Sequence, residues 1–506
     1  MAAIDELRKI RLKKLEAIRK AGINVYPAKT KRTHKIAEAL KDFAQLSRLK
    51  KEVILVGRIR SLREHGGATF LHLEDGSDKI QAYFKRDRIG ERGYKFFLEN
   101  FDIGDFIEVR GILFKTKRGE KTIEVADYKM LAKSLLSLPE KWHGIRDIEE
   151  RFRKRYLDLI FNPETKKKFE TRSEIIKEIR EFLEKEGFIP METPILQPIY
   201  GGAKAKPFKT YLNALSLDLY LRIAPELYLK RLLVGGFEKV YEIGRVFRNE
   251  GMDRYHNPDY THLEFYWAYA DYKDLMQLVE RMFESLIKKI FGRLEIKYRA
   301  PQQRGEGEDE AGVPIAYEGK KINFKTPWPR IEFYQVFKKY TKINLEEIHP
   351  EALKKEAKKL GIEIEKGEGK AEIADKIYKK YCQPQIWNPS FLINHPLGSF
   401  PLAKPLDNNP SKLASFQLLV AGWELALGFS ELNDPLLQRE RFEEQEKFFR
   451  TGLEEAQRMD EDFLEALEYG MPPAAGFGLG IDRLVALLTD SHSLREVILF
   501  PTMRPK

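Results

Sequence analysis

Hydrophobic and polar positions follow two different periods in the first quarter of the chain. Over residues 4–20, apolar side chains recur at near-helical spacing among basic ones, and the run ends at Gly22. This pattern predicts an amphipathic basic helix. From about residue 52 to residue 132 the pattern changes to five short runs rich in β-branched and aromatic residues, separated by Gly or Asp-Gly. Five short strands in so small a segment predict a β-barrel.

The predicted barrel has the strand number and size of an oligonucleotide-binding (OB) fold. Such a barrel presents aromatic and polar side chains on its second and third strands to single-stranded nucleic acid. Phe70, His72 and Gln81 occupy these strands here. A buried core position for Phe70 is the alternative, so the pattern alone leaves the role of this barrel open.

The longer C-terminal part mixes helical and strand patterns. A helix is predicted over 171–186, and the segment FIPMETPIL after it contains two prolines, which exclude a regular central strand. Two strand-like stretches surround a loop between 240 and 270. The polar segment 302–312 predicts a loop, and the Lys/Glu-rich segment 350–381 predicts surface helices of an insertion.

Composition narrows the class of protein. The chain has 506 residues, of which 42% are hydrophobic and 33% charged, as is typical of a folded globular protein of several domains. No stretch approaches the roughly 18 consecutive apolar residues of a membrane span. The one cysteine, Cys382, excludes a disulfide framework. We therefore expect no membrane association and a cytoplasmic location.

The positive charge is concentrated at the N-terminus. The formal net charge is +11, and residues 1–50 contain 14 Lys or Arg against 5 Asp or Glu. This excess predicts a polyanionic partner. A solvated charged helix without a partner is the alternative.

The two stretches between 240 and 270 predict an antiparallel hairpin with one polar face. In VYEIGRVFRNE, strict alternation places Arg248 and Glu250 on the same face. In DYTHLEFYWAY, the side chains that share a face are Tyr260, His262, Glu264 and Tyr266. Such a surface can bind an anion and a cation at once. A structural ladder of salt bridges is the alternative.

Two carboxylates stand in the apolar segment FQLLVAGWELALGFSELND. Glu424 and Glu431 are costly to bury without a cation, so they are candidate ligands of an ammonium group or of Mg²⁺. They differ in strand parity, and we expect a bulge at Gly428 to turn both toward one site. A half-exposed edge strand is the alternative.

Glycines alternate along the strand predicted in GFGLGIDRLVALL. Gly476, Gly478 and Gly480 let another molecule lie flat on that strand, and Arg483 in the following helix can reach a phosphate. The spacing G-x-G-x-G excludes the G-x-G-x-x-G dinucleotide fingerprint. Close packing of the glycines without a ligand is the alternative.

Together with FIPMETPIL, these last two constellations resemble the three signature motifs of class II aminoacyl-tRNA synthetases. Within that class the match is close to bacterial-type lysyl-tRNA synthetases. It is carried by GGAKAKPF, LYLRIAPELYLKRLLVGGFEKVYEIGRVFRNEG, HNPDYTHLEFYWAYADY, GFSELNDP and GLGIDRLVALLTDSHSLREVILFPTMRP. The resemblance covers nearly the whole chain. It implies an α+β fold, with an antiparallel-sheet class II synthetase catalytic domain behind an N-terminal five-stranded OB-fold β-barrel.

The resemblance also implies an organisation and an activity. The domains would be a basic helical extension over 1–48, an anticodon-binding OB-fold over 49–138, and a catalytic domain over 139–506 with an insertion around 300–380. The activity would be ATP-dependent activation of L-lysine to lysyl-adenylate, followed by transfer to the 3′ end of tRNA(Lys). Mg²⁺ is the implied cofactor, and a homodimer is the implied assembly.

Matching positions imply roles for individual residues toward ATP. Arg248 binds the α-phosphate, His256 meets the terminal phosphates, and Arg483 clamps the nucleotide from the other side, so Arg248 and Arg483 are the expected catalytic pair. Glu250 and Tyr260 contact adenine. Glu424 binds ATP and a metal ion, with Gln417 as a second and weaker metal ligand.

Further positions match the amino-acid pocket and the anticodon-binding face. The α-amino group is expected at Gly202 and Glu226, and the lysine carboxylate at Arg248. The residues expected around the lysine side chain are Glu264, Tyr266 and Glu431. The positions expected to bind the anticodon are Phe70, Gln81 and Glu124.

The chain departs from the family pattern at two of its positions. Gln417 stands where a metal-binding glutamate is usual, and Leu427 stands where a lysine-contacting asparagine is usual. Gln417 carries no charge and Leu427 cannot form a hydrogen bond, so one metal ligand and one contact to the ε-ammonium group are weakened or lost.

Three other functions are compatible with parts of this pattern. An aspartyl- or asparaginyl-type synthetase shares the architecture, but the glutamate-rich pocket argues against it. A paralogue that transfers lysine to elongation factor P would lack the barrel. A non-catalytic tRNA-binding protein derived from a synthetase is disfavoured by Arg248 and Arg483.

Overall fold

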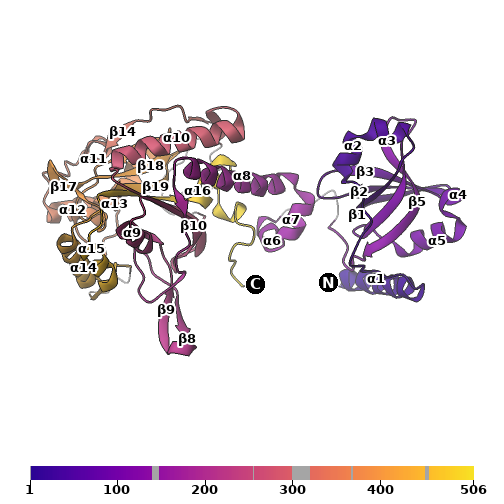
Figure 1. Ribbon diagram of the computed structural model, residues 1–506, viewed down its shortest axis with the longest axis horizontal. Coiled ribbons are helices and arrows are strands. Elements are labelled where there is room, and N and C mark those ends of the chain that lie inside the picture. Colours follow the sequence, from indigo (N-terminus) through magenta and orange to yellow (C-terminus); the bar gives the residue numbers. More distant parts are fainter. Residues whose placement is uncertain are drawn as a thin grey trace. The chain divides into compact units, whose positions relative to one another are not determined.

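The chain folds into two compact units, Met1–Arg146 and Asp147–Lys506 (Figure 1). The computed structural model describes residues 2–139, 147–254, 256–298, 320–365, 368–450 and 455–505. The loop predicted over 302–312 lies outside these residues. Each unit has a hydrophobic core of its own.

The first unit is a closed five-stranded barrel with the strand order β1-β2-β3-β5-β4. Its strands are β1 (Glu52–His65), β2 (Ala68–Glu74), β3 (Lys79–Lys85), β4 (Phe106–Lys115) and β5 (Lys121–Ala132). β3 and β5 pair in parallel, and the other neighbours are antiparallel. Successive side chains point alternately into the core and outward. The barrel predicted from the sequence is confirmed.

Helices cover the outside of this barrel. They are α1 (Ala2–Lys20), α2 (Ile36–Lys41), α3 (Phe43–Arg48), α4 (Arg86–Ile89) and α5 (Glu91–Asn100). The basic helix predicted over 4–20 is confirmed as α1. Its apolar stripe packs along the second half, because Leu15 and Ile18 are buried whereas Leu7 is exposed. Arg11 anchors the helix by donating to the carbonyl oxygens of Ile103, Ser134 and Leu136 at 2.9–3.0 Å.

The second unit is built on an eight-stranded sheet with the order β14-β15-β18-β19-β20-β11-β10-β6. The strands are β6 (Ile189–Pro190), β10 (Lys239–Phe247), β11 (Asp259–Ala268), β14 (Arg330–Glu332), β15 (Ser390–Ile393), β18 (Ser415–Val420), β19 (Trp423–Ser430) and β20 (Ala474–Gly480). The pairs at the two edges are parallel, and the pairs between them are antiparallel. The antiparallel-sheet fold expected from the sequence is confirmed.

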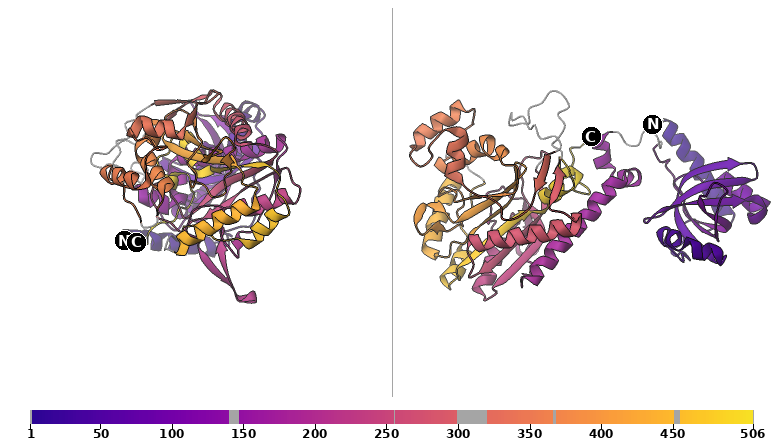
Figure 2. Two further views of the ribbon diagram at one scale, coloured as in Figure 1. Left: turned by 90° about the vertical axis from the view of Figure 1, so that its left-hand side faces the viewer. Right: turned by 90° about the horizontal axis from the view of Figure 1, so that it is seen from above.

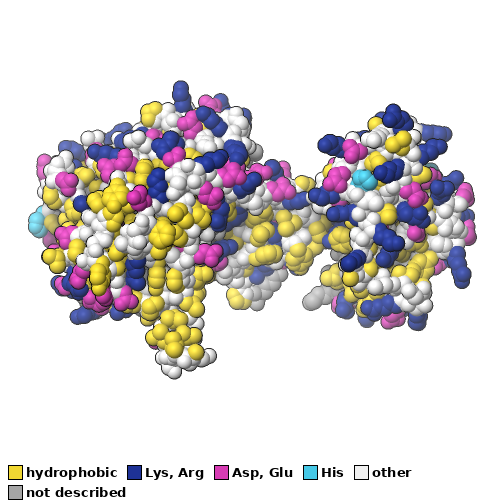
Figure 3. Space-filling view, viewed as in Figure 1, with side chains coloured by type: hydrophobic (Ala, Val, Ile, Leu, Met, Phe, Trp, Pro, Cys, Tyr) yellow, Lys and Arg dark blue, Asp and Glu magenta, His cyan; other side chains and the backbone are white. Residues whose placement is uncertain are grey.

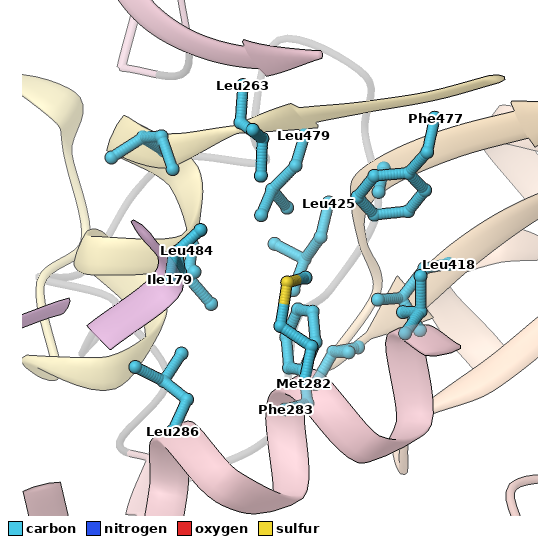
Figure 4. Packing of buried hydrophobic residues seen from close by; sticks show 14 of the residues in the cluster. Ile179, Leu263, Met282, Phe283, Leu286, Leu418, Leu425, Phe477, Leu479 and Leu484 are labelled. Atoms are coloured by element: carbon cyan, nitrogen blue, oxygen red, sulfur yellow. The ribbon is translucent and has the colours of Figure 1, made fainter. Parts of the chain in front are cut away.

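One face of this sheet is covered by helices α8 (Pro163–Lys185), α10 (Tyr272–Phe291) and α16 (Ile481–Leu488). Figure 4 shows Met282 and Phe283 of α10 packed toward Leu425 and Leu479 of the sheet. Full burial of each such side chain contributes about 1.5–3 kcal/mol. This core occupies one face of the sheet, so the side chains that alternate with it point to the opposite face.

The described part of the insertion predicted around 300–380 contains β13 (Lys320–Asn323), β14, α11 (Phe333–Thr341), α12 (Pro350–Lys359) and α13 (Lys370–Tyr381). Residues 299–319 lie outside the described range. The three helices share a small apolar cluster, and Cys382 is buried in it. Burial raises the pKa of this thiol to about 12.

Further helices and strands belong to the second unit. They are α6 (Ile148–Arg153), α7 (Arg155–Phe161), β7 (Leu196–Gln197), β8 (Lys209–Leu212), β9 (Leu217–Leu221), α9 (Glu226–Val234), β12 (Glu295–Tyr298), β16 (Pro405–Leu406), β17 (Asn409–Leu413), α14 (Pro435–Arg450) and α15 (Glu461–Glu468). The β8–β9 hairpin projects from the body of the unit in Figures 1 and 2. None of the described helices is long and apolar enough to cross a membrane.

Candidate active site and nucleic-acid-binding face

A cavity of about 550 Å³ lies on the side of the sheet that α10 leaves free. Its wall combines side chains of β11, β18, β19 and β20 with the loop after β10, the start of α9, and α13. The predicted site residues that line it are Gly202, Glu226, Arg248, Glu250, His256, Tyr260, Glu264, Tyr266, Gln417, Glu424 and Arg483. Segments that are far apart in the sequence thus form one site. Glu431 does not line the cavity and lies behind its wall.

Strand β11 contributes one polar row to the cavity. The alternation predicted from the sequence is confirmed, because the cavity is lined by Tyr260, His262, Glu264 and Tyr266. The Tyr266 hydroxyl donates to Glu264 Oε2 at 2.9 Å. Burial, together with Arg248 and Arg483, lowers the pKa of His262 to about 3, so its ring is neutral at physiological pH.

Strand β10 ends earlier than the alternation predicted. It stops at Phe247, so Arg248 and Glu250 lie in the following loop and not on the strand. The last pair of the ladder joins Phe247 to Asp259. The ladder ends there because the next position would pair Arg248 with Pro258, which has no N–H to donate. Its carbonyl oxygen instead accepts from the Arg248 backbone N–H at 2.8 Å. Both polar side chains line the cavity from this loop.

Two arginines bring positive charge to the cavity. Arg248 lies with its guanidinium carbon 5.5 Å from the ring centroid of Tyr260, and its Nε is buried without a hydrogen-bond partner among the described residues. Arg483 donates to the Glu424 carbonyl oxygen at 3.0 Å, and its Nη2 lies 3.3 Å from His256 Nε2. A buried donor without a partner is rare in folded proteins and indicates a place for an anionic ligand.

The glycines of β20 allow close approach to the cavity. A Cβ at Gly476 would overlap Glu431 Oε1 and would lie 2.5 Å from a ring carbon of Tyr266. A Cβ at Gly478 would lie 3.0 Å from His262 Nε2. Gly476 and Gly478 also line the cavity. The close-packing alternative and the ligand-binding interpretation therefore both apply to this strand.

The bulge predicted at Gly428 is at a different residue. Gly428 pairs regularly with Phe416 and Phe477, whereas the register of β18 and β19 shifts at Leu425. A Cβ at Gly428 would lie 2.6 Å from the ring of Phe416, so tight packing explains this glycine. The extra residue at Leu425 changes the parity of the strand, and Glu424 lines the cavity as a result.

The side-chain carbonyl oxygen of Gln417 already has one neighbour within hydrogen-bond distance. Its Oε1 lies 3.2 Å from His395 Nε2, and His395 Nδ1 lies 3.0 Å from the Ser415 hydroxyl. Burial lowers the pKa of His395 to about 4, so the ring is neutral. Among the described residues, no three His, Cys, Asp or Glu side chains come together as a metal site.

Three carboxyl groups are buried at the cavity wall or directly behind it: Glu226, Glu264 and Glu431. Burial is the main cause that raises the pKa of all three, and Glu226 adds to the effect on Glu264, whose pKa is about 8. Carboxyl groups with raised pKa values gain most from a cationic partner. The wall is therefore suited to an ammonium group.

Sequence reasoning missed Lys230 and the contribution of α13. Lys230 is fully buried, and its Nζ lies 2.6 Å from Glu226 Oε1 and forms an ion pair with Glu431. The signal was present in the sequence, because Lys230 follows Glu226 by four residues and so shares its helix face. No comparable signal placed Asp375 and Lys379 of α13 in the cavity wall.

The barrel carries a second candidate site on its outer face. Phe70 of β2 is half-buried and stacks on Tyr83 of β3, with ring centroids 4.7 Å apart, so it is not a core residue. Gln81 accepts from Thr122 at 2.9 Å and donates to Glu120 at 2.8 Å. Glu124 of β5 pairs with Tyr83. The three predicted positions thus lie on adjacent strands, and Tyr83 is an aromatic residue that the prediction missed.

Fold and geometry agree with two family models. Residues 147–504 match the family described as tRNA synthetases class II (D, K and N), and residues 53–131 match the OB-fold nucleic acid binding domain. The chain therefore belongs to the class II tRNA synthetases. It is an enzyme of the aminoacyl-tRNA synthetase type.

Individual relatives are similar along their whole length. The lysine–tRNA ligase of Carboxydothermus hydrogenoformans is 49% identical over 504 residues, which cover 99% of each chain. The lysine–tRNA ligase of Moorella thermoacetica is 46% identical over 507 residues, which cover 100% of this chain and 99% of the relative. That of a Roseiflexus species is 46% identical over 505 residues, or 99% of each chain. The resemblance identified from the sequence motifs is confirmed.

Proposed function

We propose that this enzyme activates L-lysine with ATP and transfers the lysyl group to the 3′ end of tRNA(Lys). The observation that carries the proposal is the charge distribution of a single cavity. Two arginines, Arg248 and Arg483, line it together with the buried carboxyl groups of Glu226 and Glu264. A substrate pair with anionic phosphates and two ammonium groups matches both kinds of charge.

In the first step, a carboxylate oxygen of lysine attacks the α-phosphorus of ATP. The bond from that phosphorus to the bridging oxygen breaks, and pyrophosphate leaves. The lysine carboxylate and the α-phosphate are assigned to Arg248, and neutralisation of the phosphates is assigned to Arg483, which lies in the helix that follows β20. No nucleophile from the enzyme is needed, because positioning and charge neutralisation carry the step.

In the second step, a terminal ribose hydroxyl of the tRNA attacks the carbonyl carbon of lysyl-adenylate. An ester forms and AMP leaves with the bonding electron pair. Adenine binding is assigned to Glu250 and Tyr260, and contact with the terminal phosphates to His256. All three side chains line the same cavity as the arginines, which supports this assignment.

The lysine pocket is assigned to the glutamate-rich part of the cavity. Gly202 and Glu226 would receive the α-amino group, and Glu264, Tyr266 and Glu431 the side chain. Gly202 has φ +86° and a Cβ there would lie 2.8 Å from the Glu226 side chain, so only glycine leaves room at this point. Leu427 packs in the apolar cluster that contains Phe429, so it contributes an apolar wall in place of a hydrogen bond.

Mg²⁺ is proposed as the metal that accompanies ATP. Mg²⁺ is usually held by one or two carboxylates together with substrate phosphates and waters. Glu424 supplies one carboxylate at the cavity, and Gln417 has one carbonyl oxygen that already has His395 as a neighbour. These residues fit an ion that arrives with the nucleotide, and the ion would supply charge neutralisation at the phosphates.

The barrel is proposed to bind the anticodon. Phe70 and Tyr83 offer a stacked aromatic pair, and Gln81 and Glu124 offer polar groups on neighbouring strands. Single-stranded bases stack on such rings, and polar side chains beside them distinguish base edges. The basic helix α1 would add attraction to the tRNA backbone.

A homodimer and a cytoplasmic location belong to the same proposal. The projecting β8–β9 hairpin exposes Tyr211, Leu215 and Leu217, with exposed fractions of 54%, 71% and 41%. Figure 3 shows hydrophobic side chains gathered on this hairpin. A second copy of this chain would cover them. The buried, unreactive thiol of Cys382 is compatible with a reducing compartment.

Amino-acid-dependent exchange between ATP and pyrophosphate tests the proposal. Lysine should support exchange, and the other nineteen amino acids, including aspartate and asparagine, should support little or none. Exchange that is fastest with aspartate or asparagine would overturn the lysine assignment. Absence of exchange with every amino acid, with tRNA binding retained, would favour a non-catalytic protein.

A further inference from the structure

Lys230 occupies an unusual position beside the amino-acid pocket. It lies on α9, one turn after Glu226, and its side chain has no exposed surface. Its Nζ is 2.6 Å from Glu226 Oε1 and forms an ion pair with Oε2 of Glu431. The rings of Tyr266, Phe429 and Phe463 surround the ammonium at 5.6–6.0 Å. One internal ammonium thus bridges two glutamates that come from separate elements.

The ammonium of Lys230 binds one oxygen of each glutamate and does not bind the other oxygen. Glu431 Oε1 is buried and has no hydrogen-bond partner among the described residues. This oxygen lies directly behind Gly476, where a Cβ would overlap it, and Gly476 lines the cavity. Glu226 Oε2 lies at the cavity wall, 3.5 Å from where a Cβ of Gly202 would be. A buried acceptor without a donor is costly, so the free oxygen of Glu431 indicates a missing ligand.

We propose that Lys230 is a positioning residue that fixes the spacing of two ammonium sites. By binding one oxygen of Glu226 and one of Glu431, it directs the remaining oxygens toward a substrate that carries two amino groups. This inference rests on the proposed lysine activation. It adds that Lys230 makes the enzyme select among diamino acids by the distance between their two nitrogen atoms, and so by the length of the side chain.

The charges around Lys230 explain why an internal cation is needed. The charged and polar groups that face Lys230 come from four elements. Glu226 lies on α9 with Lys230, Glu264 and Tyr266 lie on β11, Arg248 lies in the loop after β10, and Glu431 directly follows β19. Burial would lower the pKa of Lys230, but Glu226 and Glu431 outweigh it and raise that pKa, so the ammonium stays charged. Lys230 partly offsets the effect of burial, so without its ammonium the pKa values of Glu226, Glu264 and Glu431 would rise further.

The variant Lys230→Met tests the proposal in the full-length enzyme. Pyrophosphate exchange is measured with lysine and with ornithine, whose side chain is one methylene shorter, after normalisation by active-site titration. We expect the KM for lysine to rise at least about 30-fold, as for truncation of one member of a buried charge pair, with the KM for ATP within twofold. The preference for lysine over ornithine should fall at least about fivefold.

A second variant covers the case in which Lys230→Met does not fold. Lys230→Arg keeps the charge but replaces a point donor with a planar fork, so we expect a folded enzyme whose lysine-to-ornithine preference is still reduced. Wild-type KM and wild-type preference in a folded Lys230→Met or Lys230→Arg enzyme would overturn the proposal. Equal changes in the KM values of lysine, ornithine and ATP would also overturn it, because a purely structural lysine has that effect.

A matched control is available in the first unit. Lys133 is also fully buried and also bridges two carboxylates, those of Asp102 and Asp105. Lys133→Met should lower the melting temperature and leave the KM for lysine and the lysine-to-ornithine preference unchanged, and a changed preference would overturn the proposal. If the wild-type enzyme shows no lysine-dependent exchange at all, the proposed function fails first. Unaltered selectivity in an active enzyme contradicts only the role of Lys230.

Discussion

The two units each contain a buried lysine that bridges two carboxylates, but only one of these clusters is complete. In the barrel unit, Lys133 donates to Asn100 O at 2.9 Å, to Asp102 Oδ2 at 2.5 Å and to Asp105 Oδ2 at 2.7 Å. The outer oxygens are also bonded, because Asp102 Oδ1 accepts from Lys14 and Asp105 Oδ1 accepts from the Ser134 backbone N–H. Every donor and acceptor of this cluster has a partner within the protein.

The cluster around Lys230 differs in this respect. It pairs with Glu226 and Glu431, but Glu431 Oε1 has no donor among the described residues. The pKa directions do not separate the two clusters, because burial raises the pKa of Asp105 as it raises that of Glu431, although Lys133 and Lys14 lower the pKa of Asp102. A saturated cluster stabilises a fold, and an unsaturated one beside a cavity is prepared for a ligand. Buried charge alone therefore does not distinguish the two clusters. The carboxylate oxygen without a hydrogen-bond donor, beside a cavity, does.

The largest expected effect comes from the unsatisfied arginine of the cavity. Arg248→Ala should lower pyrophosphate exchange by at least about 100-fold, because a preorganised charge at the reacting centre is lost, with little change in melting temperature. The matched variant is Arg11→Ala in the barrel unit, where the guanidinium is bonded to three carbonyl oxygens. It should lower stability and spare exchange. Near-normal exchange by folded Arg248→Ala would contradict the assignment.

The next effect concerns the free oxygen of Glu431. Glu431→Gln removes a buried negative charge next to the proposed ε-ammonium site, so lysine affinity should fall by about 2–5 kcal/mol. ATP affinity should change less than twofold. Calorimetric titration with each ligand separately makes the measurement. Equal losses for both ligands would indicate a structural role, like that of Asp105 in the barrel cluster.

A moderate effect is expected on the barrel's outer face. Phe70→Ala should weaken tRNA charging through the KM for tRNA, by about 1–3 kcal/mol for one lost base stack, without altering its salt dependence or lysine-dependent exchange. Neutralising Lys9, Lys13 and Lys20, which leaves the pair between Lys14 and Asp102 intact, should instead flatten the salt dependence. Charging by Phe70→Ala that matches the wild type at every salt concentration would remove Phe70 from the nucleic-acid-binding face.

The smallest effect is a pH dependence of lysine binding. Glu264 has a pKa of about 8, raised by burial and by Glu226, so it is largely protonated at pH 7 in the empty enzyme. Lysine requires the carboxylate, so its affinity should increase severalfold as pH rises from 7 to 8.5, with release of a proton on binding. Titration calorimetry in two buffers of different ionisation enthalpy measures this proton. Glu264→Gln should abolish the dependence, and a pH-independent wild type would contradict it.

The local sequence pattern was sufficient to predict those features of the structure that depend only on the spacing of side chains along a helix or strand. The alternation along β11 predicted which residues face the site, and the near-helical spacing of apolar residues predicted α1. Both periods follow directly from backbone geometry. Where the chain leaves regular structure, the prediction was wrong: β10 stops at Phe247 because of Pro258, and the bulge is at Leu425 and not at Gly428.

The sequence by itself determined the barrel, the antiparallel sheet and the family, because these depend on the order and period of residues along the chain. Only the tertiary structure decided which charges are satisfied. Lys230 and Glu431 are about two hundred positions apart in the sequence. No local sequence pattern predicts that they form an ion pair, or that one oxygen of Glu431 has no donor among the described residues. Whether each buried donor and acceptor finds a partner depends on long-range packing. The same packing therefore distinguishes the Lys133 cluster, which stabilises the barrel, from the Lys230 cluster, which is proposed to bind a substrate.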